Sequence, residues 1–129
     1  MKKEFCSYEQ SLALKELEFN EICLAYYNEL KEIHNLNGTT NALLKDMYGK
    51  DNFIAPLIQQ AFRFFRKTFG CVHNIELGFD YNHDNRTAEY DASINTSYEM
   101  YTVGCFKTYE EAEQACLDKL IELAKESKQ

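Results

Sequence analysis

Residues 55–129 follow a pattern that few folds satisfy: an amphipathic helix, three strand-like stretches and a second amphipathic helix. The first helix is expected over Ala55–Phe69, because apolar side chains recur there at three- and four-residue steps before Gly70. The second is expected over Thr108–Glu126, with glutamates in its first turn where the helix dipole favours anions. This order predicts an α+β sandwich in which two helices pack on one face of an antiparallel sheet.

The three strand-like stretches are CVHNIELGFDY, TAEYDASIN and YEMYTVGCF. The first two alternate apolar and polar residues, as half-buried antiparallel strands do. The third has apolar residues at both odd-numbered and even-numbered positions, so the pattern does not predict which of its faces is buried. Asn82–Arg86 and Asn95–Ser97 are expected to form the turns, since Asn and Asp accept left-handed backbone.

The first part of the chain predicts a helix over residues 8–17, because Ser7 and Gln10 form a capping box. Residues 20–35 fit either a further helix or a β-hairpin that turns at Asn28–Glu29. Thr39 or Thr40 is expected to cap a short helix, NALLKDMY, over residues 41–48. Pro56 is expected in the first turn of the next helix, where proline is tolerated.

The length of 129 residues predicts one domain. Within it, residues 1–52 would supply the helix, the hairpin and the short helix, and residues 53–129 the α-β-β-β-α unit. The expected fold class is therefore α+β.

A net charge of −7 argues against a nucleic-acid partner, since phosphate binding needs clustered cations. The five cysteines are an odd number without C-x-x-C spacing, which indicates reduced thiols. No signal peptide or membrane-spanning run is visible, so we expect no membrane partner and a cytoplasmic protein.

Three groups of residues could indicate a metal site or a catalytic site, and each also has a purely structural explanation. Asp80, Asn82, Asp84 and Asp91 fit positions of a calcium loop, but both flanks alternate like strands, so a hairpin turn is favoured. The three histidines are far apart and have no second ligand at helical spacing. Cys71 is two residues from a histidine, yet no third orienting group is evident. We therefore predict no catalytic residue, metal site or cofactor.

Two sets of residues are candidates for contact with a partner protein. Arg63, Arg66 and Lys67 form the one cationic cluster, which could meet an acidic partner or could simply be the solvated back of a helix. Tyr98 and Tyr101 would point to opposite faces of the third strand, so that at least one is exposed. An unpaired edge strand would also permit a homodimer.

The helix–three strands–helix order, with GCFKTYEEAEQACLDKLIEL leading into the last helix, resembles the topology of double-stranded RNA-binding domains. Those domains hold the duplex phosphates with lysines in the first turn of that helix. Here the matching residues, Tyr109–Glu113, include three carboxylates. The resemblance supports the fold and argues against RNA binding.

A second resemblance covers SYEQSLALKELEFNEICLAYYN, APLIQQAFRFFRKTFG and FKTYEEAEQACLDKLIELAKE. These segments resemble a family of small uncharacterised proteins from bacteriophages and integrated elements of gut bacteria. Its members show Leu-Gly-Phe-(Asp/Asn)-Glu-Pro-Cys, whereas residues 17–23 here are LEFNEIC, without the glycine and proline. The pattern implies a break after the first helix and favours the hairpin. It implies a mobile-element context and no catalytic residues.

Taken together, these patterns predict a non-enzymatic accessory protein of phage type that binds another protein in the cytoplasm of a bacterial host cell. The alternatives are a nucleic-acid-binding module of double-stranded RNA-binding-domain type and a small enzyme with a site around Cys71 and His73.

Overall fold

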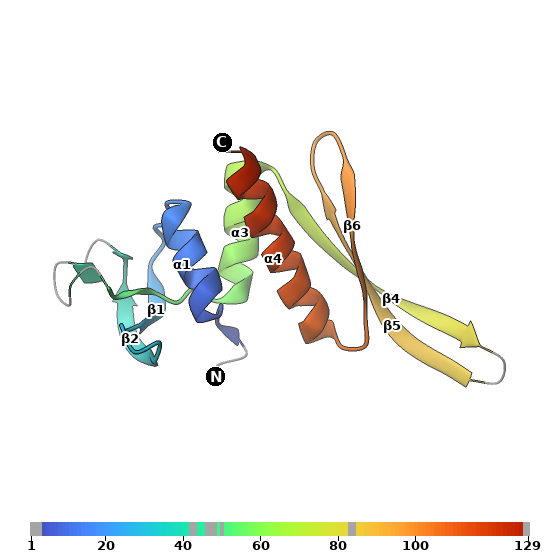
Figure 1. Ribbon diagram of the computed structural model, residues 1–129, viewed down its shortest axis with the longest axis horizontal. Coiled ribbons are helices and arrows are strands. Elements are labelled where there is room, and N and C mark those ends of the chain that lie inside the picture. Colours follow the sequence, from blue (N-terminus) through green and yellow to red (C-terminus); the bar gives the residue numbers. More distant parts are fainter. Residues whose placement is uncertain (1–3, 42–43, 46–48, 50, 83–84, 128–129) are drawn as a thin grey trace. The chain divides into compact units, whose positions relative to one another are not determined.

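The computed structural model describes residues 4–41, 44–45, 49, 51–82 and 85–127, with the backbone alone at 36–37, 79–82 and 85–88. Two compact units are present, residues 1–64 and 65–129. Each contains one three-stranded antiparallel sheet together with helical segments, which confirms the α+β class (Figure 1). The division lies inside helix α3 (Ile58–Phe69) rather than at residues 52/53, and the single domain stays a prediction.

Helix α1 (Tyr8–Glu16) begins as predicted, at a complete capping box. The Gln10 amide donates to Ser7 Oγ at 3.2 Å, and the Ser7 amide donates to Gln10 Oε1 at 2.9 Å. The helix ends in a Schellman motif: the amide of Phe19 donates to the Leu14 carbonyl, and that of Glu18 to the Lys15 carbonyl. Glu18 has φ 67°, the left-handed conformation that glycine adopts without strain.

Residues 20–35 contain a hairpin and no second helix. Strand β1 (Cys23–Tyr27) pairs with β2 (Ile33–Thr39), which extends beyond the predicted range. Asn28 forms the turn, because its Oδ1 accepts the amides of Leu30 and Glu32, each at 2.9 Å. This side-chain bonding makes an asparagine-led turn stable although Asn-Glu is a weak hairpin signal.

A short third strand, β3 (Phe53–Ile54), was not predicted. It pairs with β1, so that the first sheet has the order β2-β1-β3. The Ala55 amide donates to the Ala25 carbonyl at 2.9 Å, and the Pro56 carbonyl accepts the Cys6 amide at 2.8 Å. These bonds hold the backbone of Ala55 and Pro56 to other segments, and α3 therefore begins at Ile58, three residues later than predicted.

The predicted short helix over residues 41–48 falls mostly outside the described residues. Asn41, Leu44 and Lys45 are helical, and the Leu44 amide donates to the Thr40 carbonyl at 3.0 Å.

One buried cluster of the first unit consists of Phe5, Ala25, Tyr27, Phe53 and Ala55, and Tyr8 and Leu12 of α1 pack against it. The Tyr27 hydroxyl, buried in this core, donates to the Cys6 carbonyl at 2.7 Å, so its polar atom is satisfied.

The second unit follows the predicted order. Helix α3 ends before Gly70, which has φ 67°, and strands β4 (Val72–Asn82), β5 (Asn85–Asn95) and β6 (Met100–Phe106) follow. The sheet order is β4-β5-β6, and Asn82 pairs with Asn85 at the end of the first hairpin. Strands therefore flank the calcium-like sequence on both sides, where an EF-hand would have helices.

Strand β6 contains a β-bulge that explains its ambiguous sequence. Ile94 pairs with Tyr101 and Ser93 with Thr102, but Ala92 pairs with Gly104, so Val103 is the extra residue. In a regular strand, residues five positions apart lie on opposite faces of the sheet. Because of the bulge, Tyr101 and Phe106 lie on the same face, and both are half-buried. The inward-facing positions are therefore odd-numbered before the bulge and even-numbered after it, which explains why apolar residues occur at both.

Helix α4 (Tyr109–Ser127) lies against all three strands of the second sheet. Its buried side chains include Ala112, Cys116, Leu120 and Ala124, and β5 buries Ala92 and Ile94. Packing of α3 on the same face stays a prediction. Beyond Tyr90, the last partner of β6, the β4–β5 hairpin continues as a two-stranded ribbon away from α4 (Figure 1).

Replacing Glu18 by glycine is expected to raise the free energy of unfolding by about 0.5–1 kcal/mol, because φ 67° is strained for a residue with a Cβ. The matched control is Glu16→Gly in the last turn of α1, which should lower it by about 0.5–1 kcal/mol. Urea unfolding followed by circular dichroism measures both. Destabilisation by Glu18→Gly would contradict the left-handed cap.

Candidate functional site

A surface hollow of about 370 Å³ lies at one end of the second unit. It gathers the last residue of α3, the start of β4, the β5–β6 turn and the last turns of α4. We call it the aromatic hollow, and its lining residues are Phe69, Cys71, Thr96, Ser97, Tyr98, Tyr101, Leu123, Ala124, Glu126 and Ser127.

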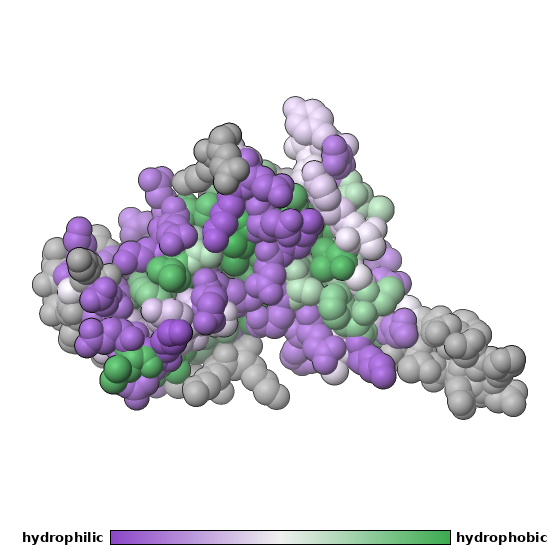
Figure 2. Space-filling view, in the orientation of Figure 1, coloured by the Kyte–Doolittle hydropathy of each residue, from purple (hydrophilic) through white to green (hydrophobic). Residues whose placement is uncertain are grey.

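The β5–β6 turn forms the most exposed wall of the aromatic hollow. Thr96 fixes the turn, because its Oγ1 accepts the amides of Tyr98 and Glu99 and its own amide donates to the Glu99 carbonyl at 2.8 Å. The turn projects from the end of the sheet (Figure 1) and is pale in Figure 2, between hydrophilic and hydrophobic. The Tyr98 side chain is 96 % exposed on this ordered turn.

The two predicted tyrosines meet at this hollow instead of pointing to opposite faces. Tyr98 lies in the turn before β6, so the alternation of a strand does not apply to it. Tyr101, on the strand, is half-buried and faces the side covered by α4, where Lys119 Nζ lies 5.6 Å from its ring centroid.

Negative charge surrounds the hydroxyl of Tyr101. A hydrogen bond to Glu99, together with the charges of Glu99 and Glu126, raises the pKa of Tyr101 above its ordinary value. Burial also raises the pKa of the Cys71 thiol in the same hollow. Both groups are therefore protonated at neutral pH, and among the described residues that line the hollow Glu126 is the acidic one.

The predicted cationic cluster consists of one ion-paired residue and two exposed ones, and its contact with a partner stays a prediction. Arg63 Nη2 lies 2.6 Å from Glu21 Oε1, so its charge is paired. Arg66 and Lys67 are exposed on the last turn of α3. Of these, Arg66 lies near His73 and, after burial, contributes to lowering the pKa of that imidazole.

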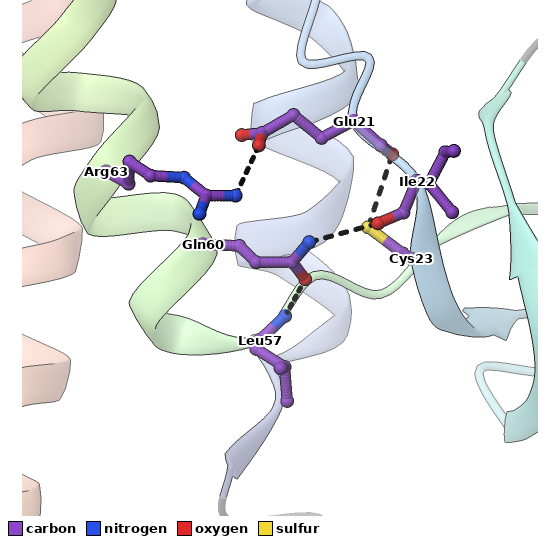
Figure 3. Close-up of polar contacts among 6 residues, drawn as sticks. All are labelled: Glu21, Ile22, Cys23, Leu57, Gln60 and Arg63. Atoms are coloured by element: carbon purple, nitrogen blue, oxygen red, sulfur yellow. Dashed lines mark hydrogen bonds and ion pairs between the residues drawn. The ribbon is translucent and has the colours of Figure 1, made fainter.

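Glu21 and Arg63 belong to a set of polar contacts that fixes the segment before β1 to the start of α3 (Figure 3). Gln60 makes two backbone bonds here: its Oε1 accepts the Leu57 amide and its Nε2 donates to the Ile22 carbonyl, each at 3.0 Å. Cys23 is fully buried beside them, and burial raises its pKa to about 12. The thiol of Cys23 therefore holds its proton at physiological pH and is a poor nucleophile. The contacts around it hold the backbone in place.

The Cys71–His73 pair, the basis of the enzyme alternative, consists of two neutral groups. Burial raises the pKa of the thiol and lowers that of the imidazole. A thiolate–imidazolium pair requires the opposite shifts. His73 lies on β4, an edge strand of the second sheet, where it pairs in register with buried Ile94 and is half-buried.

Cys105 is the exposed thiol of the chain and lies on the other face of the second sheet. Its Sγ donates to Asp91 Oδ1 at 2.8 Å, and this bond raises the pKa of the thiol. The negative carboxylate thus keeps Cys105 protonated and poorly nucleophilic at neutral pH.

A second hollow, of about 400 Å³, lies in the first unit and includes Tyr8, Phe53 and Lys15. Its rings already face cations of the same chain. Lys15 Nζ lies 5.7 Å from the Phe53 centroid, and Lys31 Nζ lies 5.2 Å from that of Tyr8. In the aromatic hollow the Tyr101 ring also faces a lysine of the chain, Lys119, but the Tyr98 side of the hollow is 96 % exposed. The aromatic hollow is therefore the stronger candidate for an external ligand.

Among the described residues no helix is long and apolar enough to cross a membrane. The same part of the chain contains no group of three or more His, Cys, Asp or Glu side chains placed to hold a metal ion. No protein family, curated protein or solved structure matches the chain.

Removing the side chain of Gln60 is expected to lower the free energy of unfolding by about 1–2 kcal/mol, since Gln60→Ala leaves two backbone groups without their bonds. Arg63→Ala should cost only about 0.5 kcal/mol, because the ion pair is half exposed. Urea unfolding measures both variants. A larger loss for Arg63→Ala would show that the ion pair, and not Gln60, holds this segment.

Iodoacetamide at pH 8 is expected to modify Cys105 first, while buried Cys6, Cys23 and Cys116 react only after unfolding. Because Asp91 raises the pKa of Cys105, Asp91→Asn should speed its alkylation about two- to five-fold and move the rate–pH midpoint downward.

Asp51→Asn is the control for this experiment and should leave the rate unchanged. Mass spectrometry of the modified peptides gives the rate at each cysteine. Modification of Cys71 as fast as Cys105 would contradict the structure of the hollow.

Proposed function

We propose that the chain is a non-enzymatic binding protein that contacts another protein through the aromatic hollow. The observation that carries the proposal is Tyr98, which is 96 % exposed on a hydrogen-bonded turn beside Phe69 and Tyr101. Aromatic side chains on ordered surfaces are common anchors of protein interfaces, since they bury a large area at little cost in conformational entropy.

The size and make-up of the hollow support this proposal. A volume of about 370 Å³ accommodates one or two side chains of a partner. Its lining includes buried or half-buried apolar side chains, Phe69, Leu123 and Ala124, and exposed polar ones, Ser97, Glu126 and Ser127. An apolar centre with a polar rim is the usual arrangement at the core of a protein–protein contact.

The cellular setting belongs to the same proposal. Five free thiols fit a reducing compartment, such as the cytoplasm of a bacterial host cell. A role as an accessory protein of a bacteriophage or prophage rests on the sequence resemblance alone.

The nucleic-acid alternative has the order of elements in its favour and the charge of α4 against it. Glu110 and Glu111 are exposed in the first turn of α4, where double-stranded RNA-binding domains place lysines. A phosphate backbone would meet two carboxylates at that point.

Affinity capture with a tagged chain tests the proposed function. Wild type is expected to retain a specific protein from bacterial extracts, and Tyr98→Ser should reduce its recovery at least about ten-fold, as loss of an interface anchor does. The matched control is Leu30→Ser, which removes a 73 % exposed apolar side chain from the β1–β2 turn and should not change recovery. Equal recovery by wild type and Tyr98→Ser would refute the hollow as the contact surface.

A further inference from the structure

The aromatic hollow combines two features that separately favour different ligands. Phe69, Tyr98 and Tyr101 offer aromatic rings, which accept apolar groups and also attract cations through the negative face of the ring. Glu126 in the lining and Glu99 beside it add carboxylates, which repel anions and lose hydration when an apolar group covers them. A positive charge attached to an apolar stem satisfies both features.

The raised pKa of Tyr101 also reflects the negative charge of the nearby carboxylates. The hydrogen bond and charge of Glu99, with the charge of Glu126, make a negative phenolate unfavourable at this position and raise the pKa of the group. A field that disfavours a negative charge favours a positive one at the same place. The ammonium of Lys119 already lies 5.6 Å from the Tyr101 ring centroid. A cationic ligand is therefore placed at the 96 % exposed Tyr98, near the carboxylates of Glu99 and Glu126.

Three rings of this chain already face lysine ammonium groups, and one of them, Tyr101, belongs to the hollow itself. Phe53, Tyr8 and Tyr101 each have a lysine ammonium of the same chain between 5.2 and 5.7 Å from the ring centroid. Tyr98, in contrast, is 96 % exposed at the rim of the hollow.

We infer that the aromatic hollow binds a cationic side chain, a lysine ammonium or an arginine guanidinium, from a basic segment of the partner protein. This inference rests on the proposed function and specifies the chemistry of the partner. The stem of the side chain lies against Phe69 and Leu123, and its charged end lies between the Tyr98 ring and the carboxylates of Glu99 and Glu126. The net charge of −7 further favours the approach of a basic partner.

The test uses the full chain labelled with nitrogen-15 and four small probes. The cationic probes are the Nα-acetyl methylamides of lysine and arginine, and the neutral ones are those of norleucine and citrulline, which match them in shape. Backbone amide signals of Thr96–Glu99 and Leu123–Ser127 are followed during each titration. We expect saturable shifts of these signals with the cationic probes and binding at least about five-fold weaker with the neutral ones.

Variants locate the site and separate its charge from its apolar surface. Glu126→Gln and Tyr98→Leu should each weaken binding of the cationic probes about three-fold. Glu110→Gln, which removes the same charge from the exposed first turn of α4, is the matched control and should leave the affinity unchanged. Norleucine binding as tightly as lysine, or absence of shifts with all four probes, would overturn the inference.

The same variants distinguish this inference from the function on which it rests. A captured partner that depends on Tyr98 but is retained equally by wild type and Glu126→Gln would overturn the cationic ligand and leave protein binding intact. Capture that does not depend on Tyr98 would remove the proposed function itself.

Discussion

The second unit depends on the pairing of β5 with β6 in two registers that meet at Val103. On one side of this bulge Tyr101 pairs with Ile94, and on the other Phe106 pairs with Tyr90. Without the extra residue, Tyr101 and Phe106 would lie on opposite faces of the sheet, because side chains alternate along a strand. The bulge therefore brings both rings to the face that α4 covers and places Tyr101 in the aromatic hollow.

Several cysteine thiols of the chain are kept protonated by their surroundings. Cys23 and Cys116 have their pKa raised to about 12 and about 11, chiefly by burial, and a hydrogen bond to Asp91 raises that of Cys105. A thiol whose proton is held this tightly is a weak nucleophile at neutral pH. This property of the thiols supports the proposal that the hollow serves recognition of a partner.

The sequence predicted the features that depend on neighbouring residues. The capping box of Ser7 and Gln10 and the helix stop at Gly70 are local, and both are present, as are the strands β4 and β5. Of the apolar positions predicted to face inward on β4, Leu77 is 54 % exposed. Strand β3 was missed because two residues, Phe53 and Ile54, are too short to show alternation. The bulge was missed because apolar residues at both odd-numbered and even-numbered positions of β6 do not show where the register changes. The hollow could not be predicted, because its lining comes from four segments that only the fold brings together.

Cross-strand nuclear Overhauser effects between β5 and β6 test the central claim most directly. The structure predicts that Ile94 is linked to Tyr101 and Tyr90 to Phe106, with Val103 lacking a directly opposed residue on β5. Links from Ala92 to Val103 and from Tyr90 to Cys105 would indicate one continuous register. That result would turn Phe106 to the other face of the sheet and contradict the bulge on which this account of the second unit depends.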